Sequence, residues 1–269
     1  MNEGNARHRP LADRHAVITG GSRGIGLAIA RALAADGATV SIMARDRERL
    51  ARAASELEAD GARVFACTID VSDEASVAAA FAAARAAFGS IDVLVNNAGV
   101  AASTPFAKTS LAQFQQLLDI NLKGVWLCTQ AFAQELADDG EGGAHWRHVV
   151  NIASTAALKG YPYVSAYCAA KHGVLGLTRA LAQEWARRRV TVNAVCPGYT
   201  ETDIVAAAVA NIRAKTGRDE AGARAALASS NPQGTLVTPE QVAHVVRSLV
   251  CAGGEAINGH AISVSGGEI

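Results

Sequence analysis

Short runs of aliphatic and β-branched residues alternate along the chain with longer stretches rich in alanine. Each short run, of which 15–19 is the first, is almost continuously apolar, as is typical of parallel strands that are covered on both faces. The alanine-rich stretches carry apolar residues at helical spacing, and several of them end at a glycine. Strands are predicted over 15–19, 39–43, 63–67, 91–95, 148–152, 190–195 and 261–264. Helices are predicted over 25–36, 47–59, 72–88 with its cap, 111–136, 165–187, 204–215, 220–229 and 239–250.

This alternation predicts an α/β fold in which right-handed crossovers build a doubly wound parallel sheet of the Rossmann-like kind. No repeat or linker composition divides the chain, so we expect a single domain over 13–269, preceded by a flexible tail over 1–12. The connection 199–234 is far longer than an ordinary loop of ~4–6 residues and has helical pieces of its own, which favours a substrate lid. The acidic, glycine-rich stretch 138–144 is expected to be a surface loop.

Composition and charge exclude several classes of function. The 269 residues include 25 Lys and Arg and 25 Asp and Glu, so the net charge is zero and lacks the basic excess of a general nucleic-acid binder. No run approaches the ~18 apolar residues of a membrane span, and the polar N-terminus does not resemble a secretory signal. The five cysteines are scattered without a CxxC pair, which predicts neither disulfides nor a metal site and favours the cytoplasm. The histidines at 145 and 148 have the wrong spacing for a metal site on one helix face.

A glycine-rich turn follows the first predicted strand. Thr19 is followed by Gly20, and Gly24 and Gly26 stand where the first helix begins. Glycines permit positive φ angles and close backbone approach, and the N-terminus of a helix attracts an anion. The place of this turn between a strand and a helix favours binding of a dinucleotide diphosphate, with a purely structural corner as the alternative.

Tyr167 and Lys171 are four residues apart on a predicted helix, so their side chains share one face. A phenol with an ordinary pKa of ~10 is a poor base at neutral pH. An ammonium ~4 Å away contributes about 4 kcal/mol at an effective dielectric of ~20, which corresponds to a lowering of the phenol pKa by up to ~3 units. We therefore expect Lys171 to lower the pKa of Tyr167 and to fit it for general acid–base catalysis, with a solvated surface pair as the alternative.

Five motifs, each at the end of a predicted strand or on the following helix, together resemble those of the short-chain dehydrogenase/reductase family. The glycine turn reads Thr-Gly-x-x-x-Gly-x-Gly rather than GxGxxG, and the resemblance extends from about residue 15 over nearly the whole chain. The other matching segments are Asn96-Asn97-Ala98-Gly99, Asn121 in the long helical stretch, Ser154 after the fifth strand, Tyr167-Cys168-Ala169-Ala170-Lys171, and Pro197-Gly198 followed by Thr202.

The resemblance implies hydride transfer between a nicotinamide cofactor and a carbonyl or secondary alcohol. Tyr167 would give a proton to the substrate oxygen in reduction and accept it in oxidation, and Ser154 would donate a hydrogen bond to that oxygen. Lys171 would also hold the cofactor ribose, and Asn121 would hold a water that links Lys171 to solvent. The implied cofactor contacts are Gly20, Ser22, Arg23, Gly24, Ile25, Gly26, Arg45, Asp70 at the adenine, Val71, Asn97, Ala98, Gly99, Tyr167, Lys171, Pro197, Gly198, Thr200 and Thr202.

The end of the second strand favours NADP(H) over NAD(H). An NAD enzyme usually places an acid there to hold the ribose 2′-hydroxyl, whereas this chain has Ala44 at that position and Arg45 beside it. Arg45, with Arg23 from the glycine turn, would suit a 2′-phosphate. Asp46 is the competing acid, because it lies about 20 residues past the glycines, but it is better placed to cap the helix that follows.

The substrate is less defined by the sequence. Tyr161, Tyr163 and Tyr199 are expected to line the substrate pocket, with simple packing as the alternative for each. The chain resembles reductases of 3-oxoacyl thioesters and polyketides, and also hydroxyacyl-CoA dehydrogenases. The alternatives are an NAD-dependent dehydrogenase of a small or cyclic alcohol, a catalytically silent nucleotide sensor, or lyase or isomerase chemistry on the same fold. The family usually forms homotetramers. Arg213, Lys215, Arg218 and Arg224 in the lid segment would suit a phosphopantetheine or CoA phosphate, or else simply be solvated.

Overall fold

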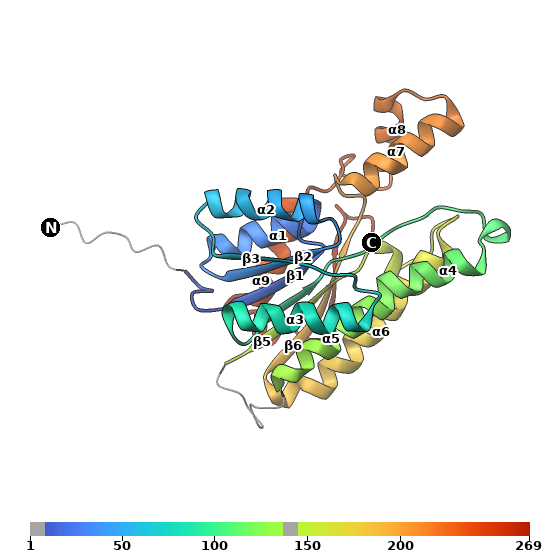
Figure 1. The fold of residues 1–269 in the computed structure, drawn as a ribbon. Coiled ribbons are helices and arrows are strands. Elements are labelled where there is room, and N and C mark those ends of the chain that lie inside the picture. Colours follow the sequence, from blue (N-terminus) through green and yellow to red (C-terminus); the bar gives the residue numbers. More distant parts are fainter. Residues whose placement is uncertain (1–8, 137–144) are drawn as a thin grey trace.

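The computed structural model describes residues 9–136 and 145–269. In that part of the chain, parallel strands form one seven-stranded sheet in the order β3-β2-β1-β4-β5-β6-β7 (Figure 1). The strand order reverses between β1 and β4, which is where an open α/β sheet leaves a crevice at its carboxyl edge. The strands are β1 (His15–Thr19), β2 (Thr39–Ala44), β3 (Val64–Thr68), β4 (Val93–Asn96), β5 (Arg147–Ile152), β6 (Val190–Pro197) and β7 (Ala261–Val264).

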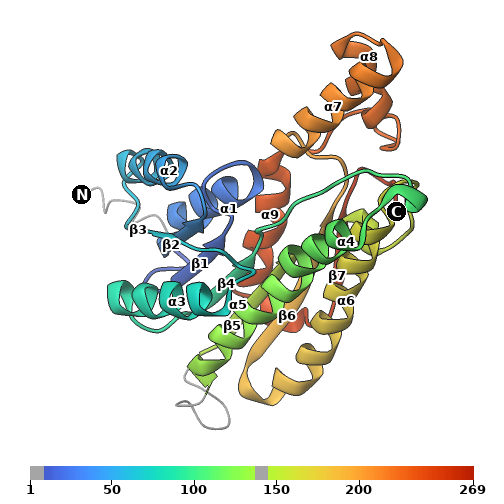
Figure 2. The same ribbon diagram turned by 45° about the vertical axis from the view of Figure 1, so that its right-hand side comes forward.

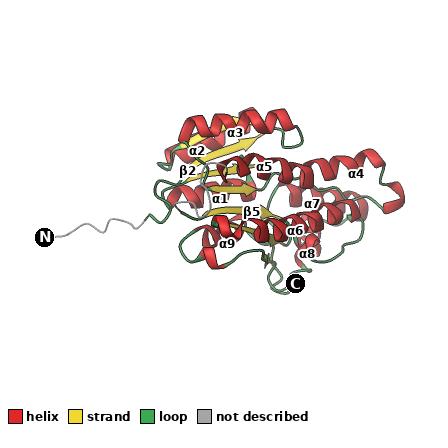
Figure 3. Ribbon diagram, turned by 90° about the horizontal axis from the view of Figure 1, so that it is seen from below, coloured by secondary structure: helices red, strands yellow, loops and turns green. Residues whose placement is uncertain are grey.

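Helices cover both faces of the sheet, as the view in Figure 3 shows. On one face lie α1 (Gly24–Ala35), α2 (Arg47–Ala59) and α9 (Pro239–Val250); on the other lie α3 (Glu74–Phe88), α5 (Gly124–Ala133) and α6 (Ser165–Trp185). Neighbouring strand residues point to opposite faces, so Ile18 packs with the first group and Val17 with the second, and both are fully buried. Burial on both faces explains the continuous apolar strands and confirms the doubly wound parallel fold.

The long helix predicted over 111–136 is interrupted. It consists of α4 (Leu111–Leu118), a π-helical turn over Asp119–Lys123, α5, and a final 3₁₀ turn. Inside the π turn, the Asn121 Nδ2 atom donates to the carbonyl oxygen of Leu117 at 2.9 Å. A side chain that bonds to the preceding turn competes with the helical ladder, and π turns recur at functional positions. The predicted helical stretch is therefore present, but it contains a π turn that its apolar pattern does not indicate, at a residue proposed from sequence for the site.

The lid segment (199–234) contains α7 (Asp203–Thr216) and α8 (Glu220–Ala228). In Figure 2 these two helices stand away from the sheet above the carboxyl ends of the strands. They share a small apolar cluster that includes Val205, Val209, Ala223 and Leu227. The segment therefore has its own packing, and its helical pieces are present as predicted, but of the two helices only residues 203–205 line the cavity at the carboxyl edge of the sheet.

Residues 9–12, which the sequence pattern places in a flexible tail, are packed against the domain. Leu11 is 3% exposed, and its N–H donates to the carbonyl oxygen of Asp36 at 3.0 Å. The rest of that tail, 1–8, and the proposed surface loop at 138–144 lie outside the described residues.

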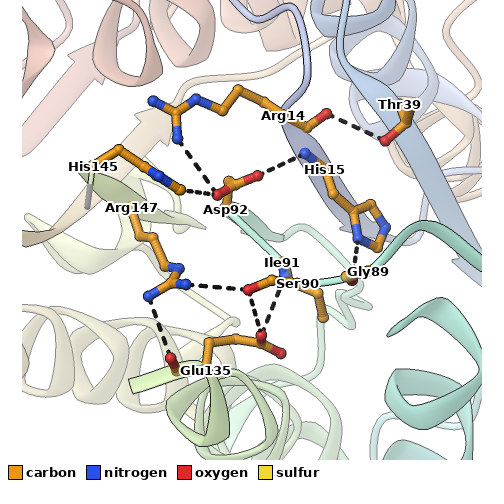
Figure 4. Close-up of polar contacts among 10 residues, drawn as sticks. All are labelled: Arg14, His15, Thr39, Gly89, Ser90, Ile91, Asp92, Glu135, His145 and Arg147. Atoms are coloured by element: carbon orange, nitrogen blue, oxygen red, sulfur yellow. Dashed lines mark hydrogen bonds and ion pairs between the residues drawn. The ribbon is translucent and has the colours of Figure 1, made fainter. Parts of the chain in front are cut away.

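A polar network ties the strands together at the opposite, amino edge of the sheet (Figure 4). The buried Asp92 carboxylate accepts from the His15 N–H at 2.9 Å, lies 3.5 Å from Arg14 and contacts His145. His148, also buried, pairs with the Thr191 hydroxyl at 2.8 Å. His145 and His148 thus contact different residues. The described residues contain no group of three or more His, Cys, Asp or Glu that could hold a metal ion.

No helix within 9–136 or 145–269 combines the length and apolar character needed to cross a bilayer.

Candidate active site

A cavity of about 800 Å³ opens at the carboxyl edge of the sheet, between the strand ends and α7. This volume is in the ~300–1,000 Å³ range of ordinary ligand pockets. Nearly all the predicted site residues line it; Gly26 and Tyr163 are the two that do not. The predicted residues in its wall are Gly20, Ser22, Arg23, Gly24, Ile25, Arg45, Asp70, Val71, Asn97, Ala98, Gly99, Asn121, Ser154, Tyr161, Tyr167, Lys171, Pro197, Gly198, Tyr199, Thr200 and Thr202.

The glycine turn brings the N-terminus of α1 close to the end of β1. Gly20 has a φ of +65°, and a Cβ there would lie 2.8 Å from the Asn97 Nδ2 atom. A Cβ on Gly26 would collide with the carbonyl oxygen of Gly20, so Gly26 acts by letting the helix approach the turn. The first turn of α1 has no acidic residue. The positive dipole end of α1 therefore faces the cavity with no carboxylate in the helix's own first turn, as an anion site requires.

Asn97 and Asp70 use their side chains to shape the cavity wall. Asn97 Nδ2 donates to the carbonyl oxygens of Thr19 at 3.0 Å and Gly20 at 3.1 Å, which joins the end of β4 to the glycine turn. Asp70 Oδ1 accepts from the Ser72 hydroxyl at 2.7 Å and the Ser72 N–H at 2.9 Å. These hydrogen bonds hold the pKa of Asp70 below its ordinary value, so the carboxylate stays ionised.

Cationic side chains gather where β2 ends. Arg45 is exposed and lines the cavity together with Arg23 and Arg49. Asp46 caps α2 by accepting from the Arg49 N–H at 3.0 Å. The carboxylate of Asp203, at the start of α7, pairs with Arg23 and lies 3.2 Å from Arg49. Three arginines therefore line this end of the cavity, and Asp46 has the capping role that favours NADP(H) in the sequence argument.

At the other end of the cavity, Ser154, Tyr167 and Lys171 come together from β5 and α6. Ser154 follows β5 in an extended conformation, and its Oγ accepts from the Ala156 N–H at 3.1 Å. Tyr167 and Lys171 lie in the first two turns of α6. The Lys171 Nζ atom donates to the carbonyl oxygen of Ile152 at 2.8 Å, so the end of β5 positions both Ser154 and Lys171.

The expected lowering of the Tyr167 pKa is not what the structure shows. Burial raises the pKa of Tyr167 to about 12, although a hydrogen bond from Ser154 opposes this. The Lys171 Nζ lies 5.7 Å from the ring centroid and is bonded to Ile152 instead of the phenol. Burial also lowers the pKa of Lys171 to about 8. Desolvation, which a sequence cannot reveal, therefore dominates the pKa of Tyr167, and the phenol is held in its protonated form at neutral pH.

Asn121 lies beside Lys171 at the floor of the cavity and is completely buried. Its Oδ1 accepts from the Val100 N–H at 3.2 Å, and its Nδ2 donates to the Val100 carbonyl at 2.9 Å. A Cβ on Gly99 would lie 2.8 Å from Asn121 Oδ1 and 3.8 Å from Lys171 Nζ. Asn121 thus fixes the backbone after β4 next to Lys171, and glycine at 99 leaves the space between them.

The three candidate substrate tyrosines separate into two groups. Tyr161 and Tyr199 line the cavity beside Thr155 and Gly198. Tyr163 is 63% exposed, has a φ of +69°, and contributes only its carbonyl oxygen, which accepts from the Thr104 N–H at 2.7 Å. Tyr163 is therefore a turn residue outside the cavity, and of the three it is the one misplaced by the sequence argument.

Sequence reasoning missed several residues of the site. Arg49 lies in the first turn of α2, just after β2, and Asp203 lies in the first turn of α7, just after the segment 200–202. These positions in the sequence could have indicated that both residues belong to the site. Thr155 follows the proposed catalytic serine directly. Glu268 follows the Ser265-Gly266-Gly267 stretch, and nothing in its local sequence connects it with Tyr161, which lies 107 positions away.

Comparisons with known proteins agree with this geometry. Residues 14–213 match the family model described as short chain dehydrogenase. A Streptomyces violaceoruber protein named "Granaticin polyketide synthase putative ketoacyl reductase 1" is 38% identical over 253 residues, which is 94% of this chain and 92% of that protein. Cis-4-hydroxycyclohexanecarboxylate dehydrogenase of Sinomonas cyclohexanicum is also 38% identical, over 96% of this chain and 97% of its own. A crystal structure of an actinorhodin polyketide ketoreductase variant with NADPH has a TM-score of 0.90 at 34% identity, covering 95% of this chain and 97% of that one.

Proposed function

This chain belongs to the short-chain dehydrogenase family and is an oxidoreductase of that family, and we propose that it uses NADP(H) to interconvert a carbonyl and a secondary alcohol. The observation that carries the proposal is the convergence of Ser154, Tyr167 and Lys171 on a cavity whose other end is the glycine turn. A sensor that has lost catalysis would not need a tyrosine in the cavity wall with a buried lysine one helical turn away and a serine beside them, so the complete set favours an enzyme.

The residues present fit a dinucleotide. The N-terminus of α1 would hold the diphosphate, Asp70 and Val71 would face the base, and Lys171 would hold the nicotinamide ribose. The rest of the cofactor site would be lined by Asn97, Ala98, Gly99 and the segment 197–202. When bound, the nicotinamide supplies or accepts a hydride at the substrate carbon.

Side chains of this protein would stabilise the substrate oxygen and exchange a proton with it. Ser154 would donate a hydrogen bond to a carbonyl oxygen, which stabilises the negative charge that develops on it during reduction. Tyr167, protonated at neutral pH because burial raises its pKa to about 12, would then transfer its proton to that oxygen. In the oxidation direction, Tyr167 would accept the proton from the alcohol. The Lys171 ammonium would stabilise the phenolate that remains on Tyr167, and Asn121 would hold a water through which Lys171 exchanges protons with solvent.

The preference for NADP(H) rests on the charges at the end of β2. Arg45 is exposed at the cavity, Arg23 and Arg49 stand near it, and Asp46 is engaged as a helix cap. A guanidinium pairs well with a phosphate in a bidentate manner, whereas a ribose diol would need an acceptor such as a free carboxylate. The related ketoreductase structure solved with NADPH supports the same choice.

For the substrate, we propose a 3-oxoacyl thioester or a related ketone, as the polyketide reductases among the relatives suggest. The second candidate is a cyclic secondary alcohol, which the hydroxycyclohexanecarboxylate dehydrogenase favours. In the lid segment, Arg213 and Arg224 pair with Glu220, and Arg224 also lies 3.5 Å from Glu201. Lys215 and Arg218 are exposed and remain the better candidates for a thioester's phosphate.

We also propose that the protein forms a homotetramer and is located in the cytoplasm. Trp126 and Leu111, on α5 and α4, are 48% and 79% exposed, which is unusual for large apolar side chains and suits a subunit contact. All five cysteines are free thiols, as expected in a reducing compartment. Sedimentation equilibrium would measure the assembly; a monomer at micromolar concentration would contradict it.

The function is tested by following oxidation of NADPH, and separately of NADH, against acetoacetyl-CoA, a 3-oxoacyl thioester mimic, a bicyclic ketone and a diketone. Cyclic alcohols with NADP⁺ and NAD⁺ test the reverse direction. Turnover that depends on Tyr167 and is faster with the phosphorylated cofactor is expected. NADPH binding without turnover of any ketone or alcohol would instead favour the nucleotide sensor.

A further inference from the structure

A buried carboxylate stands behind the substrate end of the cavity. The side chain of Glu268, which follows β7, is 3% exposed. Its Oε1 accepts a hydrogen bond from the Tyr161 hydroxyl at 2.5 Å and lies 3.1 Å from the Lys159 Nζ atom. Its Oε2 is buried without a hydrogen-bond partner in the described part of the chain, and a Cβ on Gly198 would lie 3.3 Å from it. A buried carboxylate oxygen left without a donor is costly, so stability alone does not explain a glutamate here.

The single proton of the Tyr161 hydroxyl is committed to this carboxylate. The hydroxyl also lies 2.8 Å from Thr155 Oγ1. Because a carboxylate is a stronger acceptor than a hydroxyl, Tyr161 donates to Glu268 and the Thr155 hydroxyl donates to Tyr161. Burial and the bond to Glu268 both raise the pKa of Tyr161, while the bond with Thr155 lowers it, which agrees with these directions. Tyr161 is thus held from two sides and has no proton to offer a substrate.

The backbone before Glu268 adopts a conformation that brings the carboxylate to the Tyr161 hydroxyl. Gly266 and Gly267 have φ angles of +62° and +95°, and a Cβ on Gly266 would collide with the Asn231 side chain. Asn231 in turn donates from Nδ2 to the Thr235 carbonyl at 2.7 Å, at the end of the lid segment. On the open side, the Lys159 ammonium lies 4.9 Å from the centroid of the Tyr161 ring. The ring of Tyr161 is therefore clamped between the segment after β7 and Lys159.

We propose that Glu268 is a positioning residue that fixes Tyr161 as a rigid wall of the substrate cavity and so determines which carbonyl compounds fit. The inference rests on the proposed function, because it assigns selectivity to the same site. Tyr161 lines the cavity, while Glu268 lies behind it and Thr155 directly follows Ser154 in the chain. Removing the acceptor at 268 would free the ring to turn, so substrates of different shape should change in rate by different factors.

The test compares kcat/KM for a linear 3-oxoacyl thioester mimic with kcat/KM for a bicyclic ketone. In Glu268→Ala, the ratio of the two is expected to change by about tenfold or more, the scale of one altered pocket contact. Tyr161→Phe lacks the bonded hydroxyl and should shift the ratio in the same direction. The double variant should add little to either, since both changes remove one interaction. Glu268→Gln keeps an acceptor oxygen and should restore the ratio to within about twofold of wild type, and Glu58→Gln, at an exposed site on α2, serves as the matched control.

The dissociation constant of NADPH and the melting temperature are measured on every variant. An unchanged substrate ratio in Glu268→Ala, or equal losses for both substrates that follow a lower melting temperature, would overturn the inference and leave the proposed function standing. Additive effects of the two single substitutions would overturn it as well. A wild-type protein that turns over neither substrate, nor any other compound of the panel, refutes the proposed function, and this inference falls with it.

Discussion

The Nζ atom of Lys171 lies 5.7 Å from the ring centroid of Tyr167 and donates its hydrogen bond to the carbonyl oxygen of Ile152. Both side chains line the cavity, and burial shifts their pKa values in opposite senses, to about 12 for the phenol and about 8 for the ammonium. The pair therefore consists of a proton donor, Tyr167, and a cation, Lys171, that loses its charge at alkaline pH.

The pH dependence of reduction should report this cation. With a pKa of about 8, Lys171 is charged below that pH and loses its charge above it. We expect kcat/KM for reduction to fall as the pH rises through about 8. Lys171→Arg, whose guanidinium stays charged, should be slower but should show no decline in this range. A wild-type profile that stays flat from neutral pH to well above 8, or the same inflection in Lys171→Arg, would contradict the assignment.

Arg45 should discriminate between the two cofactors. A hydrogen bond to a charged group contributes roughly 1.5–3 kcal/mol, so Arg45→Ala is expected to weaken NADPH binding by roughly 10- to 150-fold. NADH, without the 2′-phosphate, should lose at most about twofold. Fluorescence titration of the two reduced cofactors measures both values, and Arg52→Ala, an exposed position on α2, is the matched control. Equal losses for NADPH and NADH would show that Arg45 does not contact the phosphate.

His148 should make the fold sensitive to acid. Burial lowers the pKa of His148 from its ordinary 6.5 to about 4, so between these values the unfolded chain binds more protons than the folded chain. The free energy of unfolding should therefore be unaffected by this residue above about pH 6.5 and should decrease as the pH falls toward 4. At pH 5 the loss amounts to about 2 kcal/mol.

Urea unfolding at pH 7 and pH 5 checks this loss. His148→Gln should lose less stability between the two pH values than wild type, whereas His244→Gln, an exposed position on α9, should behave as wild type. The same pH-dependent loss in His148→Gln would assign it to other groups.

Asp92 should matter for stability and not for catalysis. It lies at the amino edge of the sheet, across the molecule from the cavity, where it accepts from His15 and lies 3.5 Å from Arg14. Asp92→Asn keeps the shape and removes the buried charge, so we expect a loss of about 1–3 kcal/mol in the free energy of unfolding. The matched change at the exposed Asp60, which pairs with Arg31, should cost at most about 1 kcal/mol. A large change in kcat without a change in stability would refute this separation of the two edges.

The sheet and most of its helices could be predicted because each depends on a local pattern. The bounds predicted for β1, 15–19, match the structure, since burial on both faces of the sheet requires apolar side chains at the centre of the strand. The π turn at Asn121 was missed because it depends on a side chain bonding to Leu117 and Val100, and neither bond changes the apolar period. The motif residues of the site were placed correctly in the cavity except for Gly26, which contacts the turn, and Tyr163, whose positive φ directs it elsewhere.

What the sequence could not supply were quantities set by burial and long-range contact. The charge of Lys171 suggested a lowered pKa for Tyr167, but desolvation of the phenol dominates. Glu268 meets Tyr161 only because the fold brings the segment after β7 against the segment that precedes α6. Both effects depend on the surroundings of a side chain in three dimensions, which spacing along the chain does not encode.

The most direct test of the central claim is the rate of NADPH oxidation by wild type and by Tyr167→Phe with the best ketone of the panel. If Tyr167 donates the proton, the variant should lose at least about 10²-fold in kcat, the usual scale for a removed general acid, while its dissociation constant for NADPH stays within about twofold of wild type. Comparable turnover by Tyr167→Phe, with the cofactor bound equally well, would contradict the account and remove Tyr167 from the reaction.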